Sequence, residues 1–363
     1  MIKKIISIFF WMMLLSCHQN RHIKGHTTLG LKDYYKQYFP IGVAVNMHSL
    51  TGEDSVLLLN EFNSITPEND LKIGPVHPSE NQYNWHNADE IVAFAQRHNL
   101  RIRGHNLVWH YPSQTPKWIF KDNDGKEASK QLVLQRLKEH ITTVVSRYKG
   151  KIYAWDVANE VISDKAGEYL RPSDWYRICG EDYIIKAYLW AHEADPTALL
   201  FYNDYNEINA QKREKIFRLL KSLKDAGVPV NGVGLQAHWA INEPSYSQLE
   251  STLKKFSELN LQIQITEMDI SVYPKEHTAR TRIPEDIDTA FTVQKETAQM
   301  EKYKMCFQLF RKYKNKITGV TFWNLSDKYS WLDNFPVQNR KDHPLLFDEN
   351  LQRKKAYSEV VNF

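Results

Sequence analysis

The feature that most constrains the fold of this chain is a repeated alternation of short runs rich in β-branched and aromatic residues with longer amphipathic stretches. Eight runs are predicted to be strands: Ile41–Val45, Phe62–Pro67, Arg101–Val108, Tyr153–Val157, Leu199–Asn203, Gly232–His238, Gln262–Glu267 and Gly319–Trp323. Helical patterns lie between them, at Ala88–Asn99, Gln131–Tyr148, Asp174–Ala194, Asn209–Ala226, Ser245–Asn260 and Phe291–Tyr313. Such alternation favours an α/β fold with a parallel sheet.

Eight alternations within residues 29–363 fit a single (β/α)8 TIM barrel. A doubly wound sheet is the alternative, but no Gly-rich phosphate-binding turn follows the first run. Because no linker rich in Pro or Ser divides these residues, we expect one domain. The polar, irregular segment Tyr273–Asp288 is predicted to be a loop on the functional face.

The first residues have the pattern of an export signal. Lys3 and Lys4 precede the mostly apolar run Ile5–Leu15, and Ser16-Cys17 follows. The run Leu14-Leu15-Ser16-Cys17 resembles the lipobox of bacterial lipoproteins, in which the Cys becomes the lipidated first residue. We expect a signal peptide at 1–16, then lipidated Cys17 and a polar tether at 17–28. The protein would then be anchored at the outer membrane or cell surface; a plain export signal would make it periplasmic or secreted.

Charge and cysteine content exclude several classes of protein. With 47 Lys and Arg against 43 Asp and Glu, the formal net charge is only +4, so nucleic acid is not an expected partner. Three cysteines form neither a disulfide framework nor a close-spaced zinc site, although export would permit a bridge between Cys179 and Cys306. The many aromatic residues, 10 Trp, 19 Tyr and 16 Phe, hint at a flat apolar ligand.

Polar and aromatic residues end seven of the predicted strands. In a (β/α)8 barrel the active site is built at the C-terminal ends of the strands. The segments concerned are Thr66–Lys72, Gly104–His110, Trp155–Glu160, Tyr202–Asn206, Gln236–Trp239, Thr266–Asp269 and Phe322–Asp327. A barrel under selection for stability alone does not need these residue types at seven ends, so they predict a functional site.

Two of these strand ends carry the glutamates Glu160 and Glu267. Across a barrel mouth they can flank one bond of a substrate, as glycoside hydrolysis requires, one as proton donor and the other as nucleophile or base. The donor needs a raised pKa, and a nucleophile needs hydrogen bonds that keep it ionised. We expect His238 to bond Glu267, and Asp269 to orient His238. This chemistry needs no metal and no cofactor.

Further residues are expected to bind sugar. Asn159 is placed to bond a hydroxyl beside the reacting carbon, and four aromatic residues are expected to supply faces for sugar rings: Trp109, Trp323, Trp331 and Tyr205. Asp156 is interpreted as support for the end of the fourth strand.

Simpler interpretations stay open for some of these residues. His105, His110 and His238 are candidate metal ligands, but a spacing of five puts His105 and His110 on opposite faces of an extended strand. Lys72 and Glu68 are alternatively a salt bridge at the rim. Trp331 is alternatively a core residue.

Together these segments resemble the family 10 glycoside hydrolases, chiefly endo-1,4-β-xylanases. The resemblance runs from Tyr34 to Tyr357 and rests on ordered motifs: Thr-Pro-Glu-Asn at 66–69, Arg-Gly-His-Asn-Leu-Val-Trp-His at 103–110, Ser-Gln-Thr-Pro at 113–116, Trp-Asp-Val-Ala-Asn-Glu at 155–160, Gln-Ala-His at 236–238, Ile-Thr-Glu-Met-Asp at 265–269 and Ser-Asp-Lys-Tyr-Ser-Trp at 326–331. It implies that Glu160 is the acid/base and Glu267 the nucleophile. It also implies that the xylose unit before the cleaved bond is held by Glu68, Asn69, Lys72, His105, Trp109, Asn159, Gln236, His238, Trp323 and Trp331. Asp269, Asp156 and His110 are expected to support this set.

The implied reaction is retaining hydrolysis of internal β-1,4 bonds in xylan or arabinoxylan by a monomer, with the two carboxyl groups about 5–5.5 Å apart. Two positions depart from the family pattern, with Ile73 in place of Trp and Asn324 in place of Gly, both near the glycone side. Two rivals remain: a hydrolase of another β-1,4-glucan, and a surface lipoprotein that binds glycan without catalysis.

Overall fold

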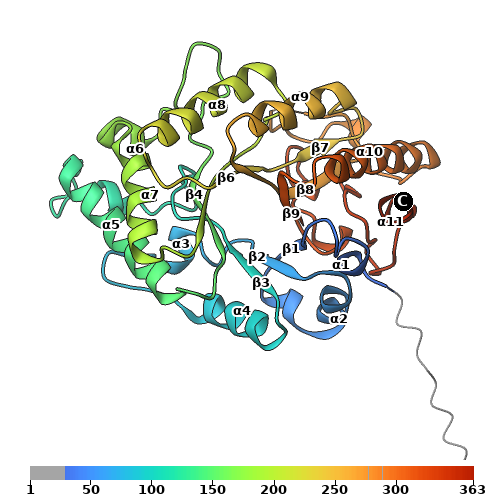
Figure 1. The fold of residues 1–363 in the computed structure, drawn as a ribbon, viewed down its shortest axis with the longest axis horizontal. Helices are drawn as coiled ribbons and strands as arrows, with labels where there is room; N and C mark the ends of the chain where they lie inside the picture. The colour runs from blue at the N-terminus through green and yellow to red at the C-terminus, as the bar shows by residue number, and fades with distance from the viewer. Residues whose placement is uncertain (1–28, 277, 288) are drawn as a thin grey trace, which may run out of the picture.

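Eight parallel strands form a closed barrel in the computed structural model, which describes residues 29–276, 278–287 and 289–363 (Figure 1). In order around the barrel the strands are β1 (Ile41–Val45), β2 (Ser64–Pro67), β3 (Arg101–Gly104), β4 (Ala154–Asn159), β5 (Leu199–Asp204), β6 (Gly232–Leu235), β8 (Gln262–Ser271) and β9 (Ile317–Phe322). Pairing of β1 with β9 and of β6 with β8 closes the ring. The predicted single (β/α)8 barrel is therefore confirmed.

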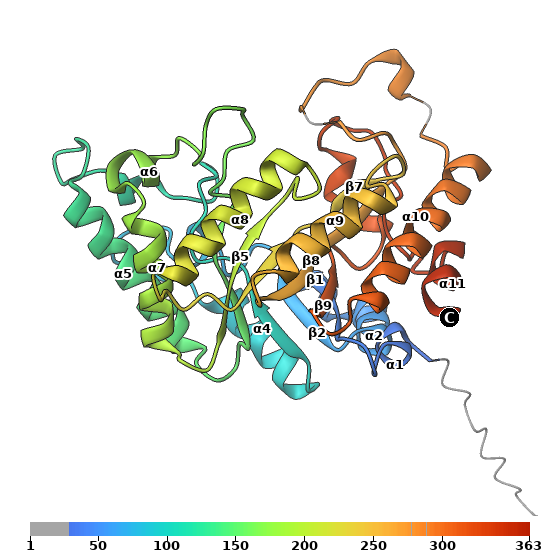
Figure 2. The same ribbon diagram turned by 45° about the horizontal axis from the view of Figure 1, so that its top comes forward.

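Helices surround the barrel, as the turned view shows (Figure 2). They are α1 (Leu31–Tyr34), α2 (Gly52–Glu61), α3 (Ile73–Val76), α4 (His86–Arg97), α5 (Lys130–Arg147), α6 (Asp174–Cys179), α7 (Asp182–Ala194), α8 (Ala210–Asp225), α9 (Tyr246–Ser257), α10 (Val293–Lys312) and α11 (Lys355–Val361). Several begin at a side chain that accepts a hydrogen bond from the first turn, including Ser129, Asn209, Ser245 and Thr292. Among the described residues, none of the helices combines the length and apolar character needed to cross a bilayer.

Two predicted elements are each divided in two by a residue with positive φ. The expected helix Asp174–Ala194 is instead α6 followed by α7, because Gly180 adopts φ +63° between them. The expected strand Gly232–His238 ends at Leu235. The chain resumes as the short strand β7 (His238–Ala240), after Ala237 at φ +62°.

The third predicted strand is shorter than expected. It leaves the regular ladder after Gly104, although the amide of Leu107 still donates to the carbonyl of Asp156. The predicted loop Tyr273–Asp288 contains a single 3-10 turn, Pro284–Asp286, among its described residues. Residues 1–28, including the predicted signal peptide, Cys17 and tether, lie outside the described residues.

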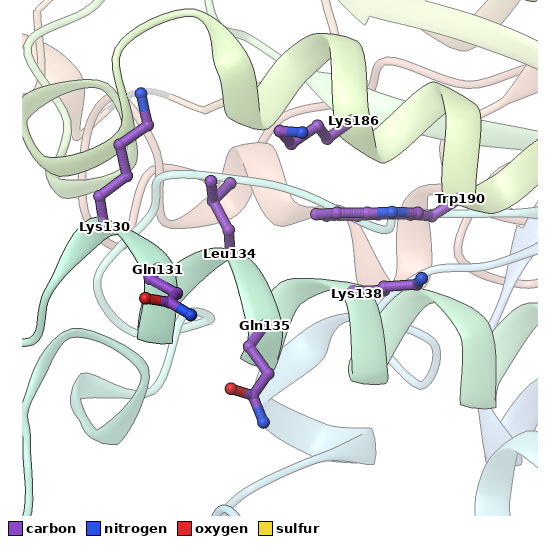
Figure 3. Close-up of a pocket in the computed structure, with 7 residues that line it drawn as sticks. All are labelled: Lys130, Gln131, Leu134, Gln135, Lys138, Lys186 and Trp190. Atoms are coloured by element: carbon purple, nitrogen blue, oxygen red, sulfur yellow. The ribbon is translucent and has the colours of Figure 1, made fainter.

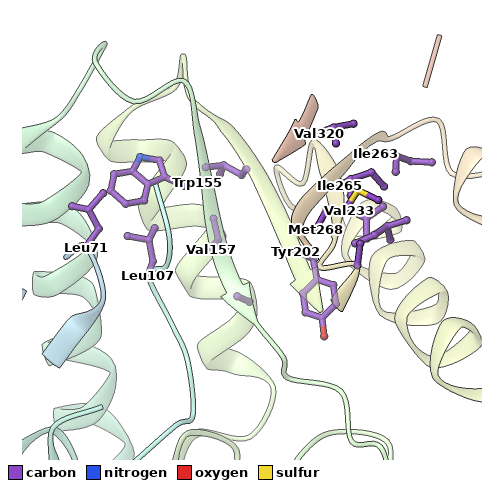
Figure 4. Packing of buried hydrophobic residues seen from close by; sticks show 14 of the residues in the cluster. Leu71, Leu107, Trp155, Val157, Tyr202, Val233, Ile263, Ile265, Met268 and Val320 are labelled. Carbon is purple, nitrogen blue, oxygen red and sulfur yellow. The ribbon is translucent and has the colours of Figure 1, made fainter. Parts of the chain in front are cut away.

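The core lies inside the barrel and between the barrel and its helices (Figure 4). Trp155 of β4 is fully buried, and it packs on β3 at Gly104, where an added Cβ would come within 2.2 Å of the indole. Tyr202, Ile265 and Met268 are buried as well. Cys179 and Cys306 are both buried and free, so the permitted bridge between them is not formed.

Candidate active site

The two predicted catalytic carboxylates lie at the carboxyl ends of strands on the same side of the barrel. Glu160 directly follows β4, and Glu267 lies within β8. Side chains from β4, β5 and the segment after β6 join them through hydrogen bonds. The site therefore draws on strands that lie far apart in the sequence, as the closed sheet requires.

Glu160 receives hydrogen bonds from three uncharged donors. The Trp109 indole N–H donates to Oε2 at 2.9 Å, and the Gln236 amide donates to Oε1 at 2.9 Å. The Asn159 amide donates to the same Oε1 at 3.2 Å. Three residues predicted for the site thus donate hydrogen bonds to the carboxyl group of Glu160.

Glu267 has a different environment, because a charged donor faces it. His238 Nε2 lies 3.1 Å from Oε2, and the Asn203 amide donates to Oε1 at 2.7 Å. Burial by itself raises the pKa of Glu267, but the hydrogen bond from His238, the charges of His105 and His238 and the bond from Asn203 lower it to about 2. Glu267 is therefore ionised at neutral pH.

His238 carries the positive charge of this pair. Burial lowers its pKa, yet the charge of Asp269 and the bonds to Asp269 and Glu267 outweigh burial and raise the pKa to about 9. Its Nδ1 donates to Asp269 Oδ2 at 2.9 Å, as β7 pairs with β8 in the register that sets His238 opposite Asp269. The predicted contacts of His238 with Glu267 and Asp269 are both present.

The residue that sequence reasoning missed is Asn203 of β5. Its Nδ2 contacts both Glu267 Oε1 and, at 2.8 Å, Asn159 Oδ1, while its Oδ1 accepts a bond from Thr266 Oγ1 at 2.6 Å. Asn203 thereby links the surroundings of the two glutamates across the barrel mouth. The sequence did indicate that the strand end Tyr202–Asn206 belongs to the site. It gave no reason to select Asn203 from that segment.

Residues after β2 lie close to both glutamates. Lys72 Nζ donates to Asn69 Oδ1 at 2.9 Å and lies 4.8 Å from the centre of the Trp109 ring. Burial lowers the pKa of Lys72, opposed by the charges of Glu267, Glu68 and Glu160. Glu68 accepts a bond from Asn46 at 3.3 Å, and its charge also acts on Lys72, so the alternative of a Lys72–Glu68 interaction at the rim stays open.

The third predicted strand end places His105 and its supports beneath the site. His105 Nδ1 bonds Asp156 Oδ2 at 2.9 Å, and both terminal nitrogens of Arg103 donate to the same carboxylate. The His105 ring meets Trp323 edge-on, with 5.3 Å between ring centres. Asp156 thus links β4 to the side chains of Arg103 and His105 at the end of the third strand.

Two aromatic candidates lie at the edges of the site. Trp331 is half-buried; its indole N–H donates to Asp269 Oδ2 at 2.8 Å and its ring stacks on Phe335 at 5.3 Å. The Tyr205 hydroxyl donates to Asp164 Oδ2 at 2.6 Å. Because Trp331 is half-buried and bonds Asp269, the carboxylate that also holds His238, the alternative that Trp331 is only a core residue is not favoured.

The three histidines considered as metal ligands lie in different surroundings. His110 lies near Glu160, and burial lowers its pKa to about 4, so it is uncharged at neutral pH. His105 and His238 are held by Asp156 and Asp269. Over residues 29–276, 278–287 and 289–363, no three His, Cys, Asp or Glu side chains are grouped to share a metal ion.

A separate hollow of about 570 Å³ lies on the outside of the barrel, between α5 and α7 (Figure 3). Its lining includes Leu134, Lys138, Lys186 and Trp190 and none of the predicted site residues.

Comparison with known proteins decides the family. The sequence matches Glycosyl hydrolase family 10 over residues 30–363. The chain belongs to this family. A β-1,4-xylanase of Dictyoglomus thermophilum is 46% identical over 341 residues, 94% of this chain and 92% of the relative. Endo-1,4-β-xylanase B of Paenibacillus barcinonensis is 46% identical over 90% of this chain and 96% of its own length.

Solved structures agree with the family assignment. A Paenibacillus barcinonensis xylanase complexed with a conduramine derivative has a TM-score of 0.87 at 45% identity, covering 92% of this chain and 98% of that one. A mutant protein in complex with xylotriose also gives 0.87, at 44% identity, covering 93% of this chain and 100% of that one.

The two departures from the family pattern have different structural settings. Ile73 begins α3 and is buried. Asn324 has φ +143°, a conformation that favours glycine, and its side chain accepts from the amide of Leu325 and donates to the carbonyl of Tyr329. These two bonds hold a side chain where glycine is usual in the family.

Proposed function

We propose that this chain is a retaining endo-1,4-β-xylanase that acts on xylan, arabinoxylan and xylo-oligosaccharides, with Glu267 as nucleophile and Glu160 as acid/base. The observation that carries the assignment of roles is the contrast between the two carboxyl groups. Glu267 faces a protonated His238 that keeps it ionised, whereas Glu160 is held by uncharged donors. A nucleophile needs the first environment, and a group that gains and loses a proton needs the second.

The reaction then follows in two displacements. Glu267 attacks the anomeric carbon while Glu160 gives its proton to the leaving oxygen, so the glycosidic bond breaks and a glycosyl ester of Glu267 forms. Glu160, now ionised, takes a proton from water as the water oxygen attacks the same carbon. The ester breaks, Glu267 leaves as carboxylate, and the product keeps the β configuration.

The named activities of the relatives support xylan as the substrate. Xylanases that are 43–46% identical to this chain are among its relatives, and one of the similar structures holds xylotriose. A glucan chain differs by a hydroxymethyl group on every ring, and we expect the buried Lys72 and Trp323 to exclude that group from the glycone side of the site. We expect aryl β-xylobioside to be hydrolysed far faster than aryl β-cellobioside; comparable kcat/KM values for the two would contradict the xylan assignment.

Removal of the nucleophile separates catalysis from glycan binding alone. Glu267→Ala should abolish hydrolysis of xylan and leave binding of xylohexaose, measured by calorimetry, largely intact. Unchanged hydrolysis by this variant would refute the role of Glu267. A parent chain that binds xylohexaose without cleaving it would favour the glycan-binding alternative.

We further propose that the protein is exported and that a lipid is attached at Cys17. Two lysines, Lys3 and Lys4, followed by the mostly apolar run Ile5–Leu15 support export, and the sequence Leu14-Leu15-Ser16-Cys17 supports lipid attachment. The anchored protein would act as a monomer at the outer membrane or cell surface. Radioactive palmitate should label the parent chain and not Cys17→Ser when each is expressed in a bacterial host. Equal labelling, or none in either, would contradict lipidation at Cys17.

A further inference from the structure

The backbone of Glu160 adopts a conformation that is unusual for its residue type. Its φ is +56°, in the left-handed region that a side chain with a Cβ disfavours. Successive residues of a strand point to opposite faces, yet the side chains of Asn159 and Glu160 meet at 3.2 Å. The left-handed turn breaks the alternation at the end of β4 and brings both side chains to the same site.

Such a conformation persists only where its surroundings hold it. On the amide side, Glu160 N–H donates to the carbonyl of Asn203 at 2.9 Å. On the carbonyl side, Arg171 Nε donates to the Glu160 oxygen at 3.0 Å, and the Arg171 amide donates to the carbonyl of Val161 at 2.8 Å. Arg171 therefore fixes the main chain where it leaves the acid/base residue.

The Arg171 guanidinium is itself anchored by a small charged cluster. Its Nη2 donates to Asp164 Oδ2 at 2.9 Å and to the Tyr205 hydroxyl at 3.0 Å. Lys212 of α8 donates to the other oxygen of Asp164 at 2.9 Å. The hydrogen bond from this cluster to Glu160 is to its main chain, whereas the three donors to the Glu160 carboxyl are Trp109, Gln236 and Asn159.

We propose that Arg171 is a positioning residue for acid catalysis, holding Glu160 in the left-handed conformation that aims its carboxyl group at the leaving oxygen. The proposal rests on the acid/base role proposed above for Glu160. Without the guanidinium, the backbone of Glu160 relaxes toward the extended region and its carboxyl group turns away, while Glu267, His238 and Lys72 keep their places.

The test compares substrates that differ in their need for a proton. A dinitrophenolate leaves without protonation, whereas a phenolate needs it, so kcat/KM for 2,4-dinitrophenyl and phenyl β-xylobioside separates attack by the nucleophile from acid assistance. We expect Arg171→Met to lower kcat/KM for the phenyl substrate by about tenfold or more and to leave the dinitrophenyl substrate within about twofold. Arg171→Lys, which keeps the charge but reaches fewer acceptors, should fall between parent and Arg171→Met.

Arg136→Met is the matched control, because Arg136 also donates to carbonyl oxygens, at Trp118 and Lys121, and pairs with Glu80. It should destabilise the fold and leave the ratio of the two kcat/KM values unchanged. Asp164→Asn weakens the ion pair that holds the Arg171 guanidinium. It should change the ratio of the two kcat/KM values in the same direction as Arg171→Met does. It replaces Arg171→Met in the test if that variant does not fold.

Glu160→Ala, measured beside these variants, distinguishes a failure of the positioning role of Arg171 from a failure of the acid/base role of Glu160. A selective loss on the phenyl substrate in Glu160→Ala but an equal loss on both substrates in Arg171→Met, or no loss on either, would overturn the positioning role alone. If Glu160→Ala itself lacks the selective loss, the acid/base assignment fails, and the proposed role of Arg171 fails with it.

Discussion

At the scale of single residues, a hydrogen-bonded series of charges sets the chemistry of the site. Asp269 holds His238, His238 faces Glu267, and Asn203 completes the surroundings of that carboxylate. The contact of His238 with both carboxylates was predictable from the motif spacing, because Glu267 and Asp269 share a face of one strand. Asn203 was not, since nothing in its own sequence context distinguishes it from its neighbours in the strand end.

His238 should titrate with a pKa near 9, well above its ordinary value of 6.5. NMR of the labelled imidazole nitrogens would measure this value, and Asp269→Asn should lower it by removing the charge that contributes most to the increase. A pKa below about 6.5 in the parent would show that His238 is not the charged partner of Glu267.

The same shifts predict how these two groups affect stability across pH. The stabilisation from His238 is complete below its unfolded pKa of 6.5 and is lost as the pH rises through about 9. Glu267, lowered from 4.5 to about 2, contributes above pH 4.5 and loses its contribution as the pH falls through about 2. Denaturant unfolding between pH 6 and 10 gives the free energy of unfolding of the parent and of His238→Asn. The difference between the two free energies should become smaller as the pH rises toward 10. A difference that does not change with pH would contradict the predicted contribution of His238.

Asn203→Ala should lower kcat by roughly 10–100-fold, because Glu267 loses a donor and Asn159 loses the partner that holds it. Initial rates on phenyl β-xylobioside measure the effect. Asn63→Ala is the matched control, because Asn63 accepts a bond from the amide of Ile41 at the start of β1, away from the glutamates. Equal losses of kcat in the two variants would indicate that Asn203 serves only the fold.

At the scale of elements, the alternation of runs located every barrel strand, and the errors fall where the chain turns away from regular geometry. Gly180 divides a predicted helix, and the sixth run breaks at Ala237 between Gln236 and His238, which both reach the site. The periodicity of the sequence does not reveal the positive φ of Ala237, because the surrounding structure imposes it, whereas the positive φ at Gly180 follows from the conformational freedom of glycine. The short helices α2 and α11 were missed for lack of a long periodic pattern.

Gly234 of β6 shows how a strand residue positions the site. A Cβ there would lie 2.3 Å from Asn203 Oδ1 and 2.8 Å from Thr266. Gly234→Ala should therefore displace Asn203 and lower both kcat and the melting temperature. In the control Gly319→Ala, the added Cβ lies 3.5 Å from its nearest neighbour, Gln264, so kcat and Tm should stay near those of the parent. Equal effects of the two substitutions would contradict a steric role for Gly234.

At the scale of the whole molecule, contacts join the N-terminal and C-terminal segments of the described chain outside the barrel. Arg353, just before α11, pairs with the buried Glu61 of α2, and the hydroxyl of Tyr357 donates to the other oxygen of Glu61 at 2.9 Å. The hydroxyl of Tyr35 donates to the carbonyl of Val360 in α11. The sequence predicted the closed barrel but not these contacts, because a buried charge pair leaves no periodic pattern.

Arg353→Met should lower the free energy of unfolding by about 1–3 kcal/mol, because it leaves the Glu61 carboxylate buried with fewer partners. The exposed Arg177, paired with Glu127 and Asp174, offers the control, and Arg177→Met should leave the free energy of unfolding close to that of the parent, because solvent screens an exposed pair. Urea unfolding measures both, and KM for xylobiosides should stay unchanged. A larger loss in the free energy of unfolding for Arg177→Met than for Arg353→Met would contradict the stabilising role of the Arg353–Glu61 pair.

The central claim is that Glu160 and Glu267 together hydrolyse xylan with retention. The most direct measurement follows the anomers of xylo-oligosaccharides by proton NMR during the first minutes of xylan hydrolysis, before they interconvert, with residues 18–363 of the parent chain and with Glu160→Gln. The account predicts that the parent releases β-anomers and that Glu160→Gln releases almost none. Early release of α-anomers would indicate inversion and contradict a glycosyl ester on Glu267, and unchanged release by Glu160→Gln would contradict its role as acid/base.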